Sequence, residues 1–151
     1  MPDKSLDQII IDSWMKCYLN ETLNIKDDAV LELEPIIRKC STAHFKAANM
    51  EKILEPYVGK LEEFLDFIGK EWNQKIEYDK TNGVIIADEK KDYCVCPLVK
   101  HGLIESGKLC DCTKGFTKKM FAYILQKDVT VEVVRSWLRD RKSCIYKITI
   151  N

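Results

Sequence analysis

The chain opens with hydrophobic residues at helical spacing. From about residue 5 to residue 20 they recur every three or four positions, which predicts an amphipathic helix with Cys17 on its buried face. A second stretch of this kind reaches about Ala48. Pro35 lies inside it, so the pattern predicts either a kink at this residue or a short turn followed by a helix that starts there.

A third helical stretch covers about residues 50–72 and carries a stripe of aliphatic and aromatic side chains. Such a stripe is typical of ordinary core packing. Pro56 and Gly59 are the points at which this helix is expected to bend or split. Residues 5–72 are therefore predicted to be mainly helical.

The hydrophobic period changes to two after Lys75. Short apolar runs flank Asn82-Gly83, and this dipeptide predicts a β-hairpin with a type I′ turn, because both residues tolerate positive φ. Residues 88–92, which follow the second run, are all charged. They are predicted to form a solvated link into a cysteine-bearing loop.

The last part of the chain combines one helix with a second hairpin. Residues 115–127 return to helical spacing, with Thr113 as the predicted N-cap. Alternating apolar residues from Val129, and again from Cys144 to the terminus, predict an antiparallel hairpin with Cys144 pointing inward. This order of elements predicts an α+β fold, with N-terminal helices packed on an antiparallel sheet and with a Cys-rich loop and one helix before the C-terminal β-hairpin.

Composition supports a single domain over residues 1–151, of which residues 75–151 form the strand-containing part. The 151 residues are 46% hydrophobic and 32% charged, which suits one core and is short for two. Lys plus Arg and Asp plus Glu both number 24, so no net field gathers nucleic acid or an anionic membrane. The sequence has no signal-peptide pattern and no apolar run of membrane-spanning length. We expect a cytoplasmic protein that binds no nucleic acid and spans no membrane.

Candidate chemistry centres on two Cys-x-Cys pairs. Cys94 and Cys96 precede a Gly-containing loop, and Cys110 and Cys112 follow it. In an extended segment, the two thiols of such a pair point to the same side of the backbone and form a two-pronged sulfur donor. Because cytoplasmic thiols stay reduced, the seven cysteines indicate metal, redox or catalytic use, or plain burial, more than a disulfide framework.

The second predicted helix offers a further pair of ligands. Cys40 and His44 are four residues apart and therefore lie on one face of this helix, at a spacing that can hold one metal ion. Alternatively, Cys40 is buried filler and His44 a partly exposed helix residue. Zinc, which prefers four thiolate or imidazole ligands, is the expected metal, and an iron–sulfur cluster is the second candidate. The predicted metal ligands are Cys94, Cys96, Cys110, Cys112, Cys40 and His44.

The C-terminal run Val-Glu-Val-Val-Arg-Ser-Trp-Leu-Arg-Asp-Arg-Lys-Ser-Cys-Ile-Tyr-Lys-Ile-Thr-Ile resembles the closing hairpin of 4-vinyl-reductase-type domains. These domains share the ligand-binding fold of haem nitric-oxide sensors and of a Golgi transport-particle subunit. Cys144, Tyr146 and Ile148 keep the family's Cys-x-Phe-x-Ile pattern, whereas Asp140 and Arg141 replace its usual Gly and Asp. Gln126 and Asp128 likewise replace a Gly and a Pro that usually precede the hairpin.

The order Cys-x-Cys-Pro, Cys-x-Cys-Thr-x-Gly-Phe and Met-Phe is similar to one branch of this group. Members of that branch tend to carry paired Cys, or Cys and another ligand, four apart on an early helix, where this chain has Cys40 and His44. The resemblance implies a small-molecule-binding or sensory domain with a Cys-rich metal site. Any signal would pass through self-association, as in a homodimer, or through a separate partner.

Two other functions use the same residues. In the first, a thiolate at the N-terminus of the helix that contains Phe116 serves a Cys-dependent hydrolase or thiol redox enzyme, with His44 or His101 as base and Asp111 nearby. In the second, the helices and sheet enclose an apolar ligand-binding pocket without metal, and the cysteines merely line it. The sequence carries no Gly-rich phosphate loop, Gly-x-Ser-x-Gly elbow or dinucleotide motif, and it does not decide whether the protein is an enzyme.

Overall fold

The computed structural model describes residues 33–151 and, before them, residues 4–5, 8, 12, 15–16, 19–20 and 22–24. The helix predicted for residues 5–20 lies largely outside the described residues, as does Cys17. Its described positions from Gln8 to Asn20 are helical. None of the described helices combines the length and the hydropathy that crossing a membrane requires.

The next helical stretches begin and end near their proline and glycine residues. Helix α2 spans Leu33–Ala47, so Pro35 lies in the first turn, where its missing N–H needs no helical acceptor. The third predicted helix is split, as its sequence indicated. It consists of α3 (Met50–Leu54), a 3₁₀ turn η1 (Glu55–Tyr57) and α4 (Leu61–Glu71), and Gly59 lies in the connection with φ of 75°.

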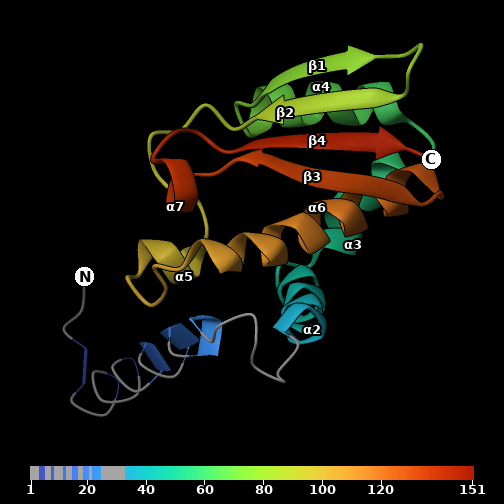
Figure 1. Ribbon diagram of the computed structural model, residues 1–151. Coiled ribbons are helices and arrows are strands. Elements are labelled where there is room, and N and C mark those ends of the chain that lie inside the picture. Colours follow the sequence, from blue (N-terminus) through green and yellow to red (C-terminus); the bar gives the residue numbers. More distant parts are fainter. Residues whose placement is uncertain are drawn as a thin grey trace.

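One four-stranded antiparallel sheet joins both hairpins, which confirms the α+β class (Figure 1). Its strands are β1 (Lys75–Asp79), β2 (Val84–Asp88), β3 (Val129–Arg135) and β4 (Ile145–Ile150), in the order β1-β2-β4-β3. The first hairpin therefore joins the second through the β2–β4 pair, in which Ala87 lies opposite Tyr146. Short helix α7 (Trp137–Asp140) occupies part of the predicted turn between β3 and β4.

The turn between β1 and β2 is not the predicted type I′ turn. Of Asn82 and Gly83, Gly83 alone has positive φ, at 63°. The Asp79 carboxylate accepts hydrogen bonds from the backbone N–H groups of Thr81 and Asn82, at 3.0 and 3.1 Å. Because Asp79 satisfies these donors, the chain forms a four-residue connection that needs positive φ at one position.

The helix after the cysteine-bearing loop starts earlier than predicted. Helix α5 (Pro97–Lys100) and a 3₁₀ turn η2 (Gly107–Leu109) precede α6, which spans Cys110–Leu125. Thr113 is therefore inside α6 and not its N-cap. The sequence pattern that predicted a loop up to Thr113 reflects only neighbouring residues. The start of α6 instead depends on tertiary packing, because Leu109 and Cys112 belong to one buried cluster with Ile37 of α2 and Ile104.

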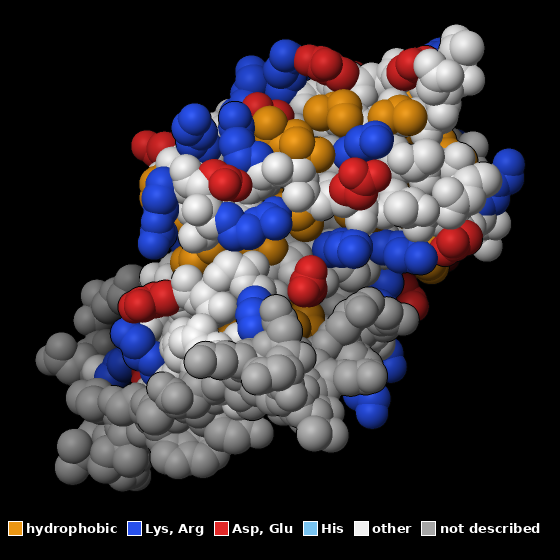
Figure 2. Space-filling view, viewed as in Figure 1, with side chains coloured by type: hydrophobic (Ala, Val, Ile, Leu, Met, Phe, Trp, Pro, Cys, Tyr) orange, Lys and Arg blue, Asp and Glu red, His pale blue; other side chains and the backbone are white. Residues whose placement is uncertain are grey.

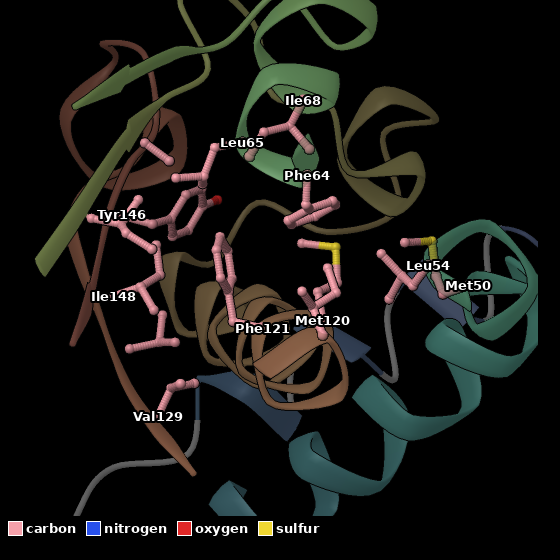
Figure 3. Packing of buried hydrophobic residues seen from close by; sticks show 14 of the residues in the cluster. Met50, Leu54, Phe64, Leu65, Ile68, Met120, Phe121, Val129, Tyr146 and Ile148 are labelled. Atoms are coloured by element: carbon pink, nitrogen blue, oxygen red, sulfur yellow. The ribbon is translucent and has the colours of Figure 1, made fainter. Parts of the chain in front are cut away.

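Helices α4 and α6 pack on the same face of the sheet and form the main core with it (Figure 3). Phe64 of α4 meets Phe121 of α6 edge to face, with ring centroids 5.5 Å apart. Such a pair contributes about 0.5–1.5 kcal/mol beyond its buried area. Ile85 and Ile148, paired across β2 and β4, are fully buried beneath these rings.

Charged side chains of both signs are interspersed on the face shown in Figure 2, with small groups of hydrophobic side chains between them. This distribution agrees with the equal totals of basic and acidic residues.

Candidate functional site

A cavity of about 580 Å³ lies between the end of α4, the ends of β2 and β4, the loop around Cys94 and the first half of α6. This volume falls in the range of about 300–1,000 Å³ that is usual for small-molecule sites. Most of the surface that faces the cavity is apolar. Its larger apolar side chains are Ile68, Trp72, Leu109, Phe116, Met120, Phe121 and Leu138.

The cavity brings together most of the residues predicted as metal ligands. Cys94, Cys96, Cys110 and Cys112 line it, and so does His44. Cys40 and His44 are both exposed on α2, but His44 borders the cavity and Cys40 lies outside its lining, so the cavity takes in one member of the predicted pair. The alternative reading, with Cys40 as buried filler and His44 as a partly exposed helix residue, is wrong for Cys40, which is exposed, whereas His44 is indeed an exposed helix residue.

The first Cys-x-Cys pair has the predicted extended backbone at its second residue. Cys96 has φ of −60° and ψ of 124° and precedes Pro97, the first residue of α5. The Cys96 carbonyl accepts hydrogen bonds from the N–H groups of Val99 and Lys100, at 3.1 and 2.9 Å. These bonds hold the Cys96 backbone in place beside the cavity.

The second pair is helical, so the extended geometry predicted for it is wrong. Residues two apart on an α-helix are separated by about 200° around the axis. Cys110 accordingly hydrogen-bonds Ser136 and lies near the Arg139 guanidinium. Cys112 points elsewhere and packs in a buried cluster with Ile37 and other apolar residues.

Burial favours the protonated form of four of the cavity thiols. Desolvation raises the pKa of Cys94 and of Cys112 to about 11, and it also raises the pKa of Cys110 and of Cys144. A thiolate was predicted at the N-terminus of this helix. For Cys110 and Cys112, desolvation acts against that prediction, because it raises the pKa of both thiols more than Arg139, near Cys110, and Lys119, near Cys112, lower it.

The residue types suit zinc, but their arrangement does not supply a preformed site. Within the described part of the chain, no three His, Cys, Asp or Glu side chains gather into a group that could hold a metal ion. His44 instead lies against Phe116, with ring centroids 4.7 Å apart. His101, the other predicted base, ends α5 as an exposed residue outside the cavity lining.

Glu89 is a cavity residue that sequence reasoning missed. It belongs to the charged stretch predicted to be solvated, yet its relative exposure is 7%. The Glu89 N–H donates to the Cys144 carbonyl at 3.0 Å, which extends the β2–β4 pairing by one residue. Ile85, Ala87 and Glu89 are two residues apart, so they lie on the same, buried face of the extended chain. This period of two is the sequence signal that could have identified Glu89 as buried.

The Glu89 carboxylate is held in an environment that disfavours its charge. Burial raises its pKa above the ordinary value, while Lys91 and a hydrogen bond from the Cys144 thiol act in the opposite direction. One carboxylate oxygen, Oε2, has no hydrogen-bond partner among the described residues. The cavity therefore contains a buried acceptor that the surrounding protein leaves unsatisfied.

Cys144, whose carbonyl accepts the Glu89 N–H, is the fifth cysteine of the cavity wall. Its predicted burial is confirmed by an exposure of 5%. The Trp137 N–H donates to Cys144 Sγ at 3.4 Å, and the Tyr146 side chain also hydrogen-bonds this thiol. Glu89, Cys144 and Tyr146 thus form one polar strip on a wall that is otherwise apolar.

Residues 12–151 match one protein family, which is described as a family of unknown function (DUF6144). The chain is a member of this family. The matched range contains the whole cavity as well as α2. A comparison with curated proteins gives no match.

Proposed function

We propose that this domain binds a small, mainly apolar molecule in the cavity, and that its cysteines form part of the wall as neutral thiols. The observation that carries the proposal is the cavity itself, about 580 Å³ in volume, with aromatic and aliphatic side chains around it. Protonated Cys94 and Cys112 suit this role, since a neutral thiol behaves as a small, weakly polar side chain. The resemblance to 4-vinyl-reductase-type domains, which implies ligand binding, supports the same function.

A cavity-filling variant tests this proposal. N-Phenyl-1-naphthylamine, a neutral apolar probe that fluoresces in dry surroundings, is expected to bind the wild-type protein saturably. Thr113 lines the cavity from α6, whereas the next residue, Lys114, is exposed. Thr113→Phe is expected to weaken probe binding by about ten-fold or more, and Lys114→Phe to leave it unchanged.

Circular dichroism and thermal melting of both variants establish that they are folded. Absence of saturable binding to the wild-type protein would contradict the proposal. Equal binding by Thr113→Phe and Lys114→Phe would also contradict it, because the probe would then bind outside the cavity.

We propose a soft-metal site as a second candidate, because four thiols from two separate Cys-x-Cys pairs line one cavity together with His44. Loading such a site would require these side chains to move closer together, since the described residues contain no three-ligand group. Elemental analysis of protein purified without chelator, with free-thiol titration, tests this candidate. Near-stoichiometric zinc or iron is expected, with thiols masked until the metal is removed.

The matched variants are Cys110→Ser/Cys112→Ser, inside the cavity, and Cys40→Ser, outside it. Metal content is expected to fall in the double variant and to persist in Cys40→Ser. Metal-free wild-type protein with freely titrating thiols would rule out this candidate and leave the apolar binding site unaffected. The thiolate enzyme gains no support, because burial raises the pKa of both Cys110 and Cys112.

A further inference from the structure

We infer that the ligand of the cavity carries a protonated amine and that Glu89 is the residue that pairs with it. This inference rests on the proposed binding function and specifies the class of ligand. It assigns the apolar body of the ligand to the aromatic wall and its cationic group to the polar strip.

The first argument is the unsatisfied oxygen of Glu89. The side chain is more than nine-tenths buried, it lines the cavity, and Oε2 accepts no hydrogen bond from the described residues. A carboxylate has only acceptors when it is ionised, so the missing partner is an N–H or O–H donor. A cationic donor also balances the buried charge, which a neutral donor cannot do.

The second argument is that the protein does not supply this cation itself. Among the described residues, no lysine or arginine forms an ion pair with Glu89. Lys91, the lysine of the cavity wall, directs its Nζ to the Trp72 carbonyl at 3.1 Å. Lys91 thus acts on Glu89 only through its charge and leaves Oε2 without a hydrogen bond, which a ligand ammonium group could supply.

The third argument is that aromatic side chains line the same cavity as this buried acid. Trp72, Phe116 and Phe121 all border the same cavity as Glu89. Aromatic faces attract cations as well as apolar groups, so they suit an amine attached to a flat hydrocarbon body. A ligand anion would meet two carboxylates, Glu89 and the more exposed Glu71, and one lysine, Lys91, so the charge of the lining disfavours it relative to a cation.

Three probes that share the 1-naphthylmethyl group test the inference. They are 1-naphthylmethylamine, 1-naphthalenemethanol and 1-naphthaleneacetate, each titrated calorimetrically near pH 7 against the whole chain. The amine is protonated at this pH. It is expected to bind about ten-fold or more tightly than the alcohol, and the carboxylate is expected to bind most weakly.

Two matched variants locate the effect. Glu89→Gln keeps the shape of the side chain and removes its charge, so it should lower the affinity for the amine to that for the alcohol. Glu71→Gln makes the same change at an exposed position of the cavity wall and should keep the preference for the amine. Unchanged affinity for the alcohol in Glu89→Gln shows that the cavity is intact. If this variant does not fold, Glu89→Asp, which keeps the charge but withdraws it by one methylene, should selectively weaken amine binding.

Equal affinities for the amine and the alcohol in the wild-type protein would overturn the inference and leave apolar ligand binding standing. An amine preference that survives Glu89→Gln, or that Glu71→Gln removes, would overturn it as well. Failure of every probe, including N-phenyl-1-naphthylamine, would instead remove the proposed binding function on which the inference rests.

Discussion

A Cβ atom placed on Gly115 of α6 would lie 2.8 Å from Oγ and 3.2 Å from Cβ of Ser41 on α2. The two helices come this close because glycine has no side chain. Ser41 is fully buried at the contact. The contact also sets the position of the neighbouring residues His44 and Phe116, which form one edge of the cavity.

We predict that Gly115→Ala destabilises the protein by about 1–3 kcal/mol, because the added methyl group overlaps Ser41 and forces the helices apart. The measurement is the free energy of unfolding in urea. Gly69→Ala on α4 is the control, since its Cβ would meet its nearest neighbour, the Gln74 carbonyl oxygen, at an ordinary 3.7 Å. This control should gain about 0.5–1 kcal/mol from the better helix propensity of alanine. Adding Ser41→Gly to Gly115→Ala should recover part of the lost stability, and equal stability of Gly115→Ala and wild type would show that the helices are not in close contact.

The buried carboxyl group of Glu89 should make the free energy of unfolding depend on pH. Because burial raises its pKa in the folded protein, the folded state holds this proton more tightly than the unfolded state does. Its contribution is therefore complete below the ordinary pKa of a glutamate and is lost as the pH rises through the raised pKa. The groups that face it are Lys91, Cys144, Tyr146 and Asp88.

We predict that Glu89→Gln removes this dependence. The free energy of unfolding of the variant minus that of the wild type should increase as the pH rises from about 4 to 8, with a slope of at most about 1.4 kcal/mol per pH unit. Taking the difference at each pH cancels the opposite contributions of other carboxylates, such as Asp128, whose pKa is lowered by its hydrogen bond with Lys118. A difference that stays constant over this range would show that Glu89 is hydrated in the folded protein.

The thiols should differ in their rates of alkylation. Cys40 is exposed, whereas burial raises the pKa of Cys94 and Cys112 to about 11. At pH 8 only about one in a thousand of such buried thiols is ionised, so iodoacetamide should modify Cys40 before Cys94 and Cys112. Pulsed alkylation read by mass spectrometry measures the order, and unfolded protein, in which all seven cysteines react, is the control. Modification of Cys112 as fast as that of Cys40 would restore the thiolate enzyme as a candidate.

Replacing Gln126 with glycine should stabilise the protein. It ends α6 with φ of 53° and ψ of 34°, a left-handed conformation that glycine adopts without strain. We predict that Gln126→Gly raises the free energy of unfolding by about 0.5–1 kcal/mol. Arg141 has φ of 53° as well, but its guanidinium lies 6.0 Å from the Trp137 ring centroid, so Arg141→Gly should gain less. A loss of stability in Gln126→Gly would show that the side-chain hydrogen bond of Gln126 to the Tyr123 carbonyl matters more than the strain.

Local patterns predicted the elements whose signals lie within a few residues. The alternation in β1 and β2 and the breaks at Pro56 and Gly59 each arise from adjacent side chains or from one backbone angle. The prediction failed where a distant group decides the local structure. The helical start at Cys110 is an example, because the cluster that holds it includes Ile37, far away in the chain.

The candidate site was also predicted in part. The sequence indicated the two Cys-x-Cys pairs as the candidate chemistry, and all four of their thiols line one cavity. The charged stretch after β2 concealed Glu89, because composition reports average solvation and not the direction of one side chain. The protonation of the thiols could not be read from residue type either, since desolvation depends on the packed surroundings.

The sequence by itself determined the α+β class, the two hairpins and the residues with metal-binding or nucleophilic chemistry, because periodicity and residue type are local properties of the chain. Only the tertiary structure decided that β2 pairs with β4. That pairing places Glu89 beside Cys144, 55 residues later in the chain, and closes an apolar cavity around an unsatisfied carboxylate oxygen. The physical reason is that burial, and with it the charge state of Glu89 and of the thiols, arises when segments distant in sequence exclude water together.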